Sequence, residues 1–188
     1  MSSGNSWLQE TCPESGVEAG QSGEAPRVST AAQPPEFRYR EATGADLPVL
    51  LVQRRKMFID MGYRDDAVLE EVEAASRRFF EERFVDGRFR AWVAEVPSGE
   101  IVAGGGVLVF DHLPSPRDPH PERPLIVNVY TEPAYRRRGI ARALIELMVG
   151  WCRERGFGSV TLYASPGGKP LYAALGFSPT NEMRMMLR

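Results

Sequence analysis

The stretch of residues 127–142, which reads VNVYTEPAYRRRGIAR, gives the clearest indication of the fold. Its first residues are mostly apolar, as in a buried strand, and we expect that strand to end at Thr131. Pro133 then turns the chain, three arginines follow, and Gly139 precedes an amphipathic pattern that predicts a helix over 137–155. The stretch therefore predicts a strand that leads into the N-terminus of a long helix.

A junction of this kind is suited to binding an anion. The first N–H groups of a helix have no partner within the helix, and the helix dipole makes this end positive. Gly139 allows a bulky ligand to approach the backbone, and the three preceding arginines suit phosphate oxygens. The residues alone predict a phosphate or pyrophosphate ligand. Neither the Walker pattern GxxxxGK(S/T) nor GxGxxG after an early strand occurs, so those two nucleotide sites are excluded.

Two motifs carry a resemblance to a known family. Arg136-x-x-Gly139-x-Ala141 resembles the pyrophosphate loop of the GNAT superfamily, the Gcn5-related N-acetyltransferases, whose pattern is Q/R-x-x-G-x-G/A. Residues 171–177, LYAALGF, resemble the L-Y-x-x-x-G-F signature of the same family. The motifs stand in the family's order with one expected strand between them. The resemblance covers residues 37–188, and the wording around the motifs is similar to that of bacterial single-domain members.

The remaining patterns predict elements in the order β-α-α-β-β-β-α-β-α-β, which is an α/β (α+β) fold. The resemblance implies a GNAT fold with a mixed central sheet of six to seven strands and flanking helices. A loop with five prolines is expected at 113–124. Strands are expected at 37–42, 89–96, 101–110, 125–131, 159–164 and 177–187, and helices at 43–62, 65–85, 137–155 and 170–175.

Composition limits the class of protein. Residues 1–35 are rich in Ser, Gly, Glu, Gln and Pro without a hydrophobic period, so we expect a disordered tail followed by one domain at 36–188. The net charge of −2 gives no general attraction to nucleic acid or an anionic membrane. No apolar run reaches the roughly 20 residues of a membrane span, and no secretory signal is visible. Only two cysteines and two histidines occur, so we expect a cytoplasmic protein without a metal site.

The resemblance also implies roles for individual residues, with acetyl-CoA as the co-substrate. Tyr172 stands at the position of the family's general acid, which protonates the departing thiolate. The strand before the loop pairs with the pantetheine arm as an extra strand would, and the loop amides hold the pyrophosphate. The cofactor-binding residues implied are Val129, Tyr130, Thr131, Arg136, Arg137, Arg138, Gly139, Ile140, Ala141, Arg142 and Ser165.

The general base and the acceptor are left open by the sequence. Members of the family often use a strand glutamate, but the strand before the loop offers only Asn128 and Tyr130, and Asp111 is a more distant alternative. The function implied is transfer of acetyl to a primary amine, on a small molecule or a peptide, by direct attack in a ternary complex. The alternative is a catalytically weak, acyl-CoA-binding regulatory module. Tyr63 to Asp66 are candidates for acceptor recognition, and family habit makes a homodimer an expectation.

Overall fold

The computed structural model describes residues 36–116 and 118–187, and the predicted tail at 1–35 lies outside the described residues. Two short 3-10 turns, Gly44–Asp46 and Pro133–Tyr135, precede α1 and α3. The elements are β1 (Arg38–Glu41), α1 (Leu47–Asp60), α2 (Asp66–Val85), β2 (Phe89–Glu95), β3 (Ile101–Asp111), β4 (Glu122–Thr131), α3 (Ile140–Glu154), β5 (Thr161–Leu162) and α4 (Lys169–Ala174).

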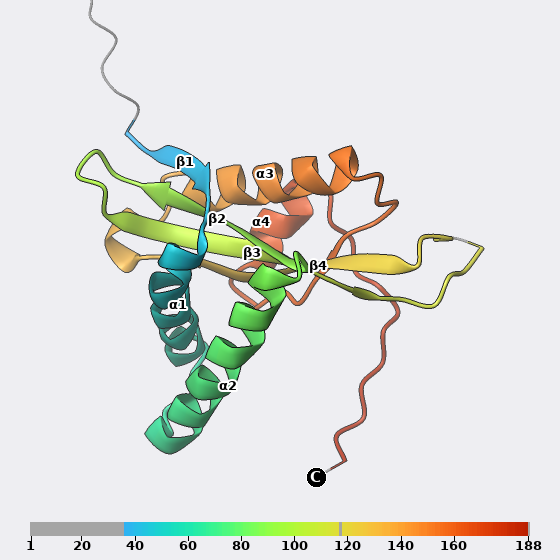
Figure 1. Cartoon of the computed structure of the whole chain (residues 1–188), viewed down its shortest axis with the longest axis horizontal. Helices are drawn as coiled ribbons and strands as arrows, with labels where there is room; N and C mark the ends of the chain where they lie inside the picture. The colour runs from blue at the N-terminus through green and yellow to red at the C-terminus, as the bar shows by residue number, and fades with distance from the viewer. Residues whose placement is uncertain (1–35, 117, 188) are drawn as a thin grey trace, which may run out of the picture. The chain divides into compact units, whose positions relative to one another are not determined.

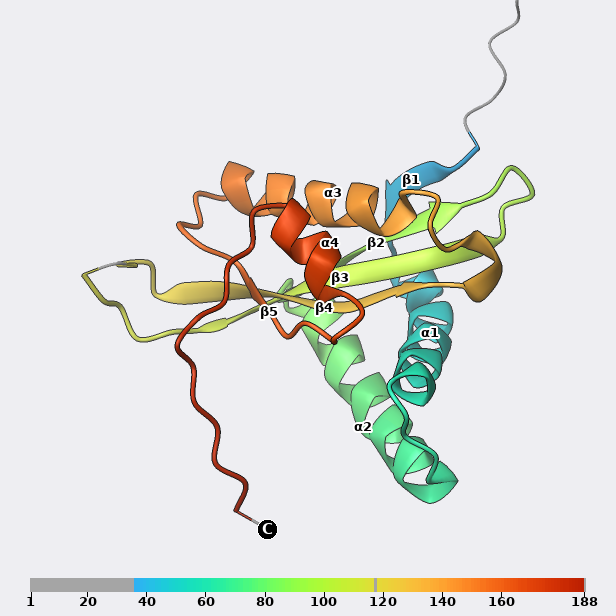
Figure 2. The same ribbon diagram turned by 180° about the vertical axis from the view of Figure 1, so that it is seen from behind.

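The strands form one mixed sheet in the order β1-β2-β3-β4-β5. The first three pairings are antiparallel, and β4 pairs with β5 in parallel. Helices α1 and α2 cover one face of the sheet, whereas α3 and α4 lie on the other (Figures 1 and 2). The predicted α/β fold with flanking helices is confirmed, but the expected six to seven strands are wrong, because the described residues form five.

The sequence predicted a last strand at 177–187, and this prediction is wrong. The described residues 177–187 form no strand and run away from the sheet (Figure 2). Met183 and Leu187 are 95% and 88% exposed. Alternating apolar residues favour a strand, but a strand exists only where a neighbour supplies N–H and C=O partners. Among the described residues the sheet ends on that side at β5, which is itself two residues long.

Both faces of the central strands are buried, so each strand contributes to two cores. Along β2, Phe89, Ala91 and Val93 pack under α1 and α2, and Trp92 and Ala94 pack under α3. This alternation follows from the two-residue period of a strand. The two cores fix α1 and α3 on opposite sides of β3 and β4, the strands that position the site.

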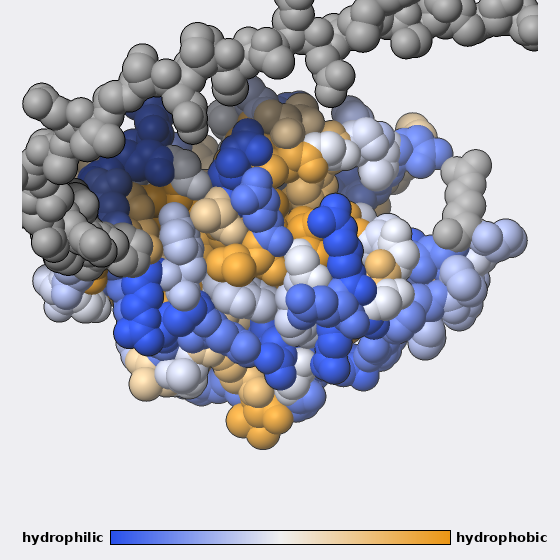
Figure 3. Space-filling model, turned by 90° about the horizontal axis from the view of Figure 1, so that it is seen from above, coloured by the Kyte–Doolittle hydropathy of each residue, from blue (hydrophilic) through white to orange (hydrophobic). Residues whose placement is uncertain are grey.

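Helix α3 spans three strands rather than presenting one narrow stripe to the sheet. Its fully buried residues are Ile140, Leu144, Ile145, Met148 and Cys152. Leu147 of the same helix is 41% exposed, whereas the buried face contacts β2, β3 and β4. On the side of the molecule that carries α3, hydrophobic residues are exposed between hydrophilic ones (Figure 3).

Asp46 joins the first strand to the first helix through a network that is nearly closed to solvent. Its carboxylate accepts two hydrogen bonds from the Arg40 guanidinium, both at 2.8 Å, and one from the Thr43 N–H at 2.7 Å. Arg40 also donates to Glu95 on β2 at 2.6 Å. The bonds from Arg40 hold the pKa of the Asp46 carboxyl well below its usual range.

We expect Asp46→Asn to lower the free energy of unfolding by about 2–3 kcal/mol at pH 7, because it removes one of the two carboxylates that pair with the partly buried Arg40 guanidinium. The folded-state pKa of Asp46 is depressed, so its stabilisation is present above the unfolded pKa and lost as pH falls. The difference between wild type and variant should therefore shrink below about pH 4. Denaturant unfolding at several pH values measures it.

Asp66→Asn is the matched control. Asp66 also pairs with an arginine, Arg55, at 2.8 Å, but its side chain is 79% exposed. An exposed pair contributes less than about 1 kcal/mol. Equal decreases in the free energy of unfolding for the two variants would show that the network around Asp46 adds no more stability than an exposed ion pair.

Candidate functional site

The site begins where β4 separates from its neighbour. Strand β4 pairs with β5 only at Leu125 and Ile126, so its edge from Val127 to Thr131 faces no strand among the described residues. The register of β4 against β3 shifts between Gly104 and Gly106, and Asn128 has φ 58°, which together mark a β-bulge. A bulge bends its strand away from regular pairing. The N–H and C=O groups of this edge are therefore available to an extended ligand.

The loop after β4 presents a row of backbone N–H groups. Arg137 and Gly139 have left-handed φ values of 62° and 81°, so α3 begins at Ile140 rather than at the predicted residue 137. Within the described residues, the N–H groups of residues 137–142 donate to no backbone oxygen. Amides that converge in this way at a helix start form a concave site for an anion.

The arginine side chains are divided between structure and solvent. Arg136 donates to the Thr131 carbonyl at 2.9 Å and pairs with Asp60 of α1. Arg138 pairs with Glu36 and lies over the ring of Phe37 at 4.8 Å. These two side chains hold the loop against α1 and the chain before β1, so their charges are partly compensated.

The other residues of the loop have different surroundings. Arg137 is exposed and has no acidic partner among the described residues. Arg142 lies 3.7 Å from Glu146 along α3, and Ile140 is buried in the core with 1% exposure. Ala141 is half-buried at the first turn. The main chain, rather than a cluster of free guanidinium groups, therefore dominates the anion site.

The three strand residues named from the sequence lie at the open end of β4. Val129 is half-buried, and its Cγ2 lies 3.3 Å from where a Cβ on Gly105 would stand. Tyr130 is 6% exposed, and the Arg136 guanidinium lies 5.4 Å from its ring centre. The Thr131 hydroxyl is buried without a hydrogen-bond partner among the described residues. All three lie directly before the amide row.

Tyr172 and Ser165 come from the segment after β5. Tyr172 on α4 is half-buried and packs edge-on against Phe177, with ring centres 5.9 Å apart. Burial raises the pKa of its phenol above the usual value, so the group stays protonated at neutral pH. The Ser165 hydroxyl accepts from the Gly168 N–H at 3.2 Å. Ser165 therefore stabilises the turn that begins α4.

The carboxylates considered from the sequence lie in other contacts. Asp111 stands at the end of β3 that pairs with Glu122, the opposite end of β4 from Thr131, and it pairs with Arg88 at 3.2 Å. Glu132, directly after β4, pairs with Lys56 at 2.7 Å. Asp111 is thus separated from the open edge by most of the strand.

The residues suggested for acceptor recognition serve the junction of α1 and α2. Asp65 is the N-cap of α2 and accepts from the Ala67 N–H at 3.0 Å. Asp66 pairs with Arg55, and Arg64 donates to the Tyr63 carbonyl at 3.0 Å. Tyr63 itself is 55% exposed.

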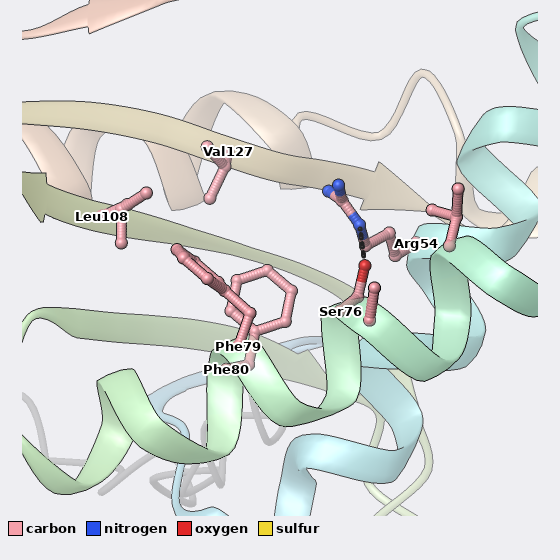
Figure 4. A pocket seen from close by; sticks show the side chains of 8 residues that line it. Arg54, Ser76, Phe79, Phe80, Leu108 and Val127 are labelled. Atoms are coloured by element: carbon pink, nitrogen blue, oxygen red, sulfur yellow. Dashed lines mark hydrogen bonds between the residues drawn. The ribbon is translucent and has the colours of Figure 1, made fainter.

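A cavity of about 400 Å³ between α1, α2 and the sheet was not anticipated from the sequence (Figure 4). Its lining residues are Arg54, Val72, Ala75, Ser76, Phe79, Phe80, Leu108 and Val127. The signal for Arg54 lay in its spacing: it follows Leu50 and precedes Phe58 by four residues each, which places a cation on the apolar stripe of α1. Asn128 likewise interrupts an apolar strand.

The described residues contain no group of three or more His, Cys, Asp or Glu side chains arranged to hold a metal ion. Of the helices in residues 36–116 and 118–187, none is long and apolar enough to cross a bilayer.

Comparisons with known proteins agree on one family. Residues 58–177 match the model of the acetyltransferase (GNAT) family. A GCN5-related N-acetyltransferase from Ralstonia eutropha is 34% identical, with 80% of this chain and 98% of that chain covered and a TM-score of 0.75. A predicted acetyltransferase from Clostridium acetobutylicum, solved with acetyl-CoA, is 27% identical over 80% of this chain and 95% of that chain, with a TM-score of 0.74.

More distant structures share the fold alone. An aminoglycoside antibiotic 6'-N-acetyltransferase from Acinetobacter haemolyticus is 17% identical, with coverage of 80% and 97% and a TM-score of 0.61. No curated protein matches the chain.

Proposed function

Since the chain belongs to the GNAT acetyltransferase family, we propose that it transfers an acetyl group to a primary amine by direct attack in a ternary complex. Acetyl-CoA is the co-substrate. The observation that carries the proposal is the open edge of β4 from Val127 to Thr131, followed at once by the unpartnered amides of residues 137–142. In this proposal residues 36–188 form the acetyltransferase domain.

The residues present fit this co-substrate. Val129, Tyr130 and Thr131 offer main-chain groups that pair with the amides of the pantetheine arm as a further strand would. The amides of residues 137–142 bind the pyrophosphate, and the exposed Arg137 adds charge beside it. The paired Arg136 acts mainly by holding the loop.

Acetyl-CoA supplies a thioester: its C–S bond breaks as a C–N bond forms to the amine. A main-chain N–H near Val129 stabilises the negative charge that develops on the acetyl oxygen. Tyr172 donates its proton to the departing sulfur, whose conjugate acid has a pKa of about 8.5, and the phenolate that remains regains a proton from water. Because burial raises the pKa of Tyr172, the phenol is still protonated when the sulfur departs.

The amine loses its proton without a dedicated carboxylate. Asp111 lies at the far end of β3, and Glu132 is held by Lys56. We therefore expect the acceptor to react from its neutral fraction, with water taking the proton. An alkyl amine has a pKa near 10.4, so kcat/KM should rise with pH across the neutral range.

Two measurements on the full chain test the function. Calorimetric titration with acetyl-CoA should give a dissociation constant between about 1 µM and 1 mM. Release of free CoA thiol should then exceed background with at least one class of amine: alkyl amines, amino acids, aminoglycosides or peptide N-termini. Binding without release from any class would favour the regulatory acyl-CoA module, and absence of binding would rule out both functions.

A further inference from the structure

The cavity on the α1 and α2 side of the sheet has the size and lining of a small-molecule site. Its volume of about 400 Å³ lies within the range of such sites. Six of its lining residues are apolar: Val72, Ala75, Phe79, Phe80, Leu108 and Val127. Arg54 and Ser76 are the polar exceptions, and Figure 4 shows the head of Arg54 between α2 and β4.

The Arg54 guanidinium is partly buried without a negative partner. Its Nε donates to the Ser76 hydroxyl at 3.0 Å, and its Nη1 donates to the Asn128 side-chain oxygen. It lies 4.7 Å from the ring centre of Phe58 and 5.7 Å from that of Phe80. Burial lowers its pKa, and no carboxylate among the described residues lies within ion-pair distance.

The neighbouring cations of α1 differ from Arg54 in this respect. Arg55 pairs with Asp66 at 2.8 Å, and Lys56 pairs with Glu132 at 2.7 Å. A cation removed from water without a counter-ion is costly, so natural proteins usually pair it. In Arg54, Nη2 makes no hydrogen bond among the described residues, and the nearby Asn128 Nδ2 is buried without an acceptor. Donors of Arg54, which lines the cavity, and of its partner Asn128 thus lack an acceptor among the described residues.

The contact with Asn128 joins this cavity to the proposed reaction site. Asn128 is the bulge residue of β4 and directly precedes Val129, where the acetyl group is expected. Arg54 is therefore one hydrogen bond from the strand that holds the donor. Helices α1 and α2, which line the cavity, lie on the face of the sheet opposite α3 (Figure 1), so an acceptor bound there need not displace the co-substrate.

We propose that the acceptor is an amino acid whose carboxylate binds Arg54 and whose apolar side chain occupies the cavity. This inference rests on the proposed function and names its substrate class. A carboxylate matches the free donors of a guanidinium in a bidentate geometry. Phe79, Phe80 and Leu108 provide apolar surface for the side chain. The reaction then yields an N-acetyl amino acid and CoA.

Calorimetry on the wild-type chain saturated with CoA tests the carboxylate without requiring turnover. The probes are L-phenylalanine and L-leucine, their carboxamides, and 3-phenylpropanoate, which keeps the carboxylate but lacks the amine. We expect the amino acids to bind at least tenfold more tightly than their carboxamides, and 3-phenylpropanoate to bind measurably. Thermal unfolding of the same samples provides a second readout.

Variants then assign the effect to Arg54. Arg54→Met should weaken binding of the amino acids about tenfold or more and leave the carboxamides within about threefold, because only the charged contact is lost. Arg54→Lys should retain part of the preference. Arg55→Met is the control, since Arg55 lies next along α1 but pairs with Asp66. In activity assays Arg54→Met should raise the KM for the amino acid more than it lowers kcat.

Three results would overturn the inference. The first is equal binding of amino acids and carboxamides to the wild type. The second is an Arg54→Met variant that keeps the preference, or that weakens all probes alike, as expected if Arg54 only supports the bulge. The third is binding of acetyl-CoA with no response to any probe, which would reject amino acids while the acetyltransferase function stands. Failure to bind acetyl-CoA would instead reject the function itself.

Discussion

Replacing Tyr172 with phenylalanine should lower kcat by about 100-fold while the affinity for acetyl-CoA stays within about twofold of wild type. The change removes one oxygen from a half-buried ring that packs against Phe177, so the fold and the co-substrate site remain. Burial raises the pKa of this phenol, which keeps it protonated and able to donate to the departing thiolate. Steady-state kinetics together with acetyl-CoA titration separates the two quantities.

Tyr163→Phe is the matched control for this variant. Tyr163 lines the same cavity beside α4 as Tyr172, but its ring is 66% exposed. Removing the Tyr163 hydroxyl should leave kcat within about twofold of the wild-type value. If Tyr172→Phe also retained its turnover, Tyr172 would not be the general acid, and water would have to protonate the sulfur.

The second large effect is expected from Gly139→Val, which should weaken acetyl-CoA binding by about ten- to hundredfold. Gly139 has φ 81°, and no heavy atom stands within 4 Å of an added Cβ, so the obstacle is the backbone conformation rather than a clash. A β-branched residue in the left-handed region costs about 1–3 kcal/mol. We expect the chain to relieve this strain by rotating the amides proposed to bind the pyrophosphate.

Gly150→Val provides the comparison within the same helix. Gly150 lies inside α3, its φ is not in the left-handed region, and a Cβ there also has no neighbour within 4 Å. Acetyl-CoA should bind this variant as it binds wild type. Unfolding without ligand measures how much of the strain at position 139 remains in the folded loop. Normal binding by Gly139→Val would mean that the amide row does not hold the pyrophosphate.

Most of the fold followed from local patterns. The boundaries of α2 and β2 agree with prediction because the N-cap Asp65 and the turn after β2 are encoded by adjacent residues. The start of α3 was missed by three residues, since left-handed Arg137 continues an apparently helical run. The last strand, at 177–187, was predicted wrongly, because a strand forms only with a pairing partner that its own sequence does not specify. Hydrophobic periodicity indicates which residues could form a strand, but it does not indicate which strand they would pair with.

The two sides of the site differed in how far they could be predicted. The proposed anion site is built from consecutive residues, so a sequence motif was enough to indicate it. The proposed acceptor cavity is assembled from α1, α2, β3 and β4, and no short motif joins Arg54 to Ser76, 22 residues further on, or to Asn128, 74 residues further on. The isolated arginine on the apolar stripe of α1 was the available clue, but it did not reveal its neighbours.

Cys152 lies on the buried face of α3, and this has a practical consequence for measuring the reaction. The thiol is 3% exposed, and burial raises its pKa to about 11, so almost none is thiolate at neutral pH. Disulfide-exchange dyes react with thiolates that they can reach, and Cys152 is neither ionised nor accessible. In the folded protein Cys152 therefore gives no colour with such a dye, and liberated CoA can be measured without background from this thiol.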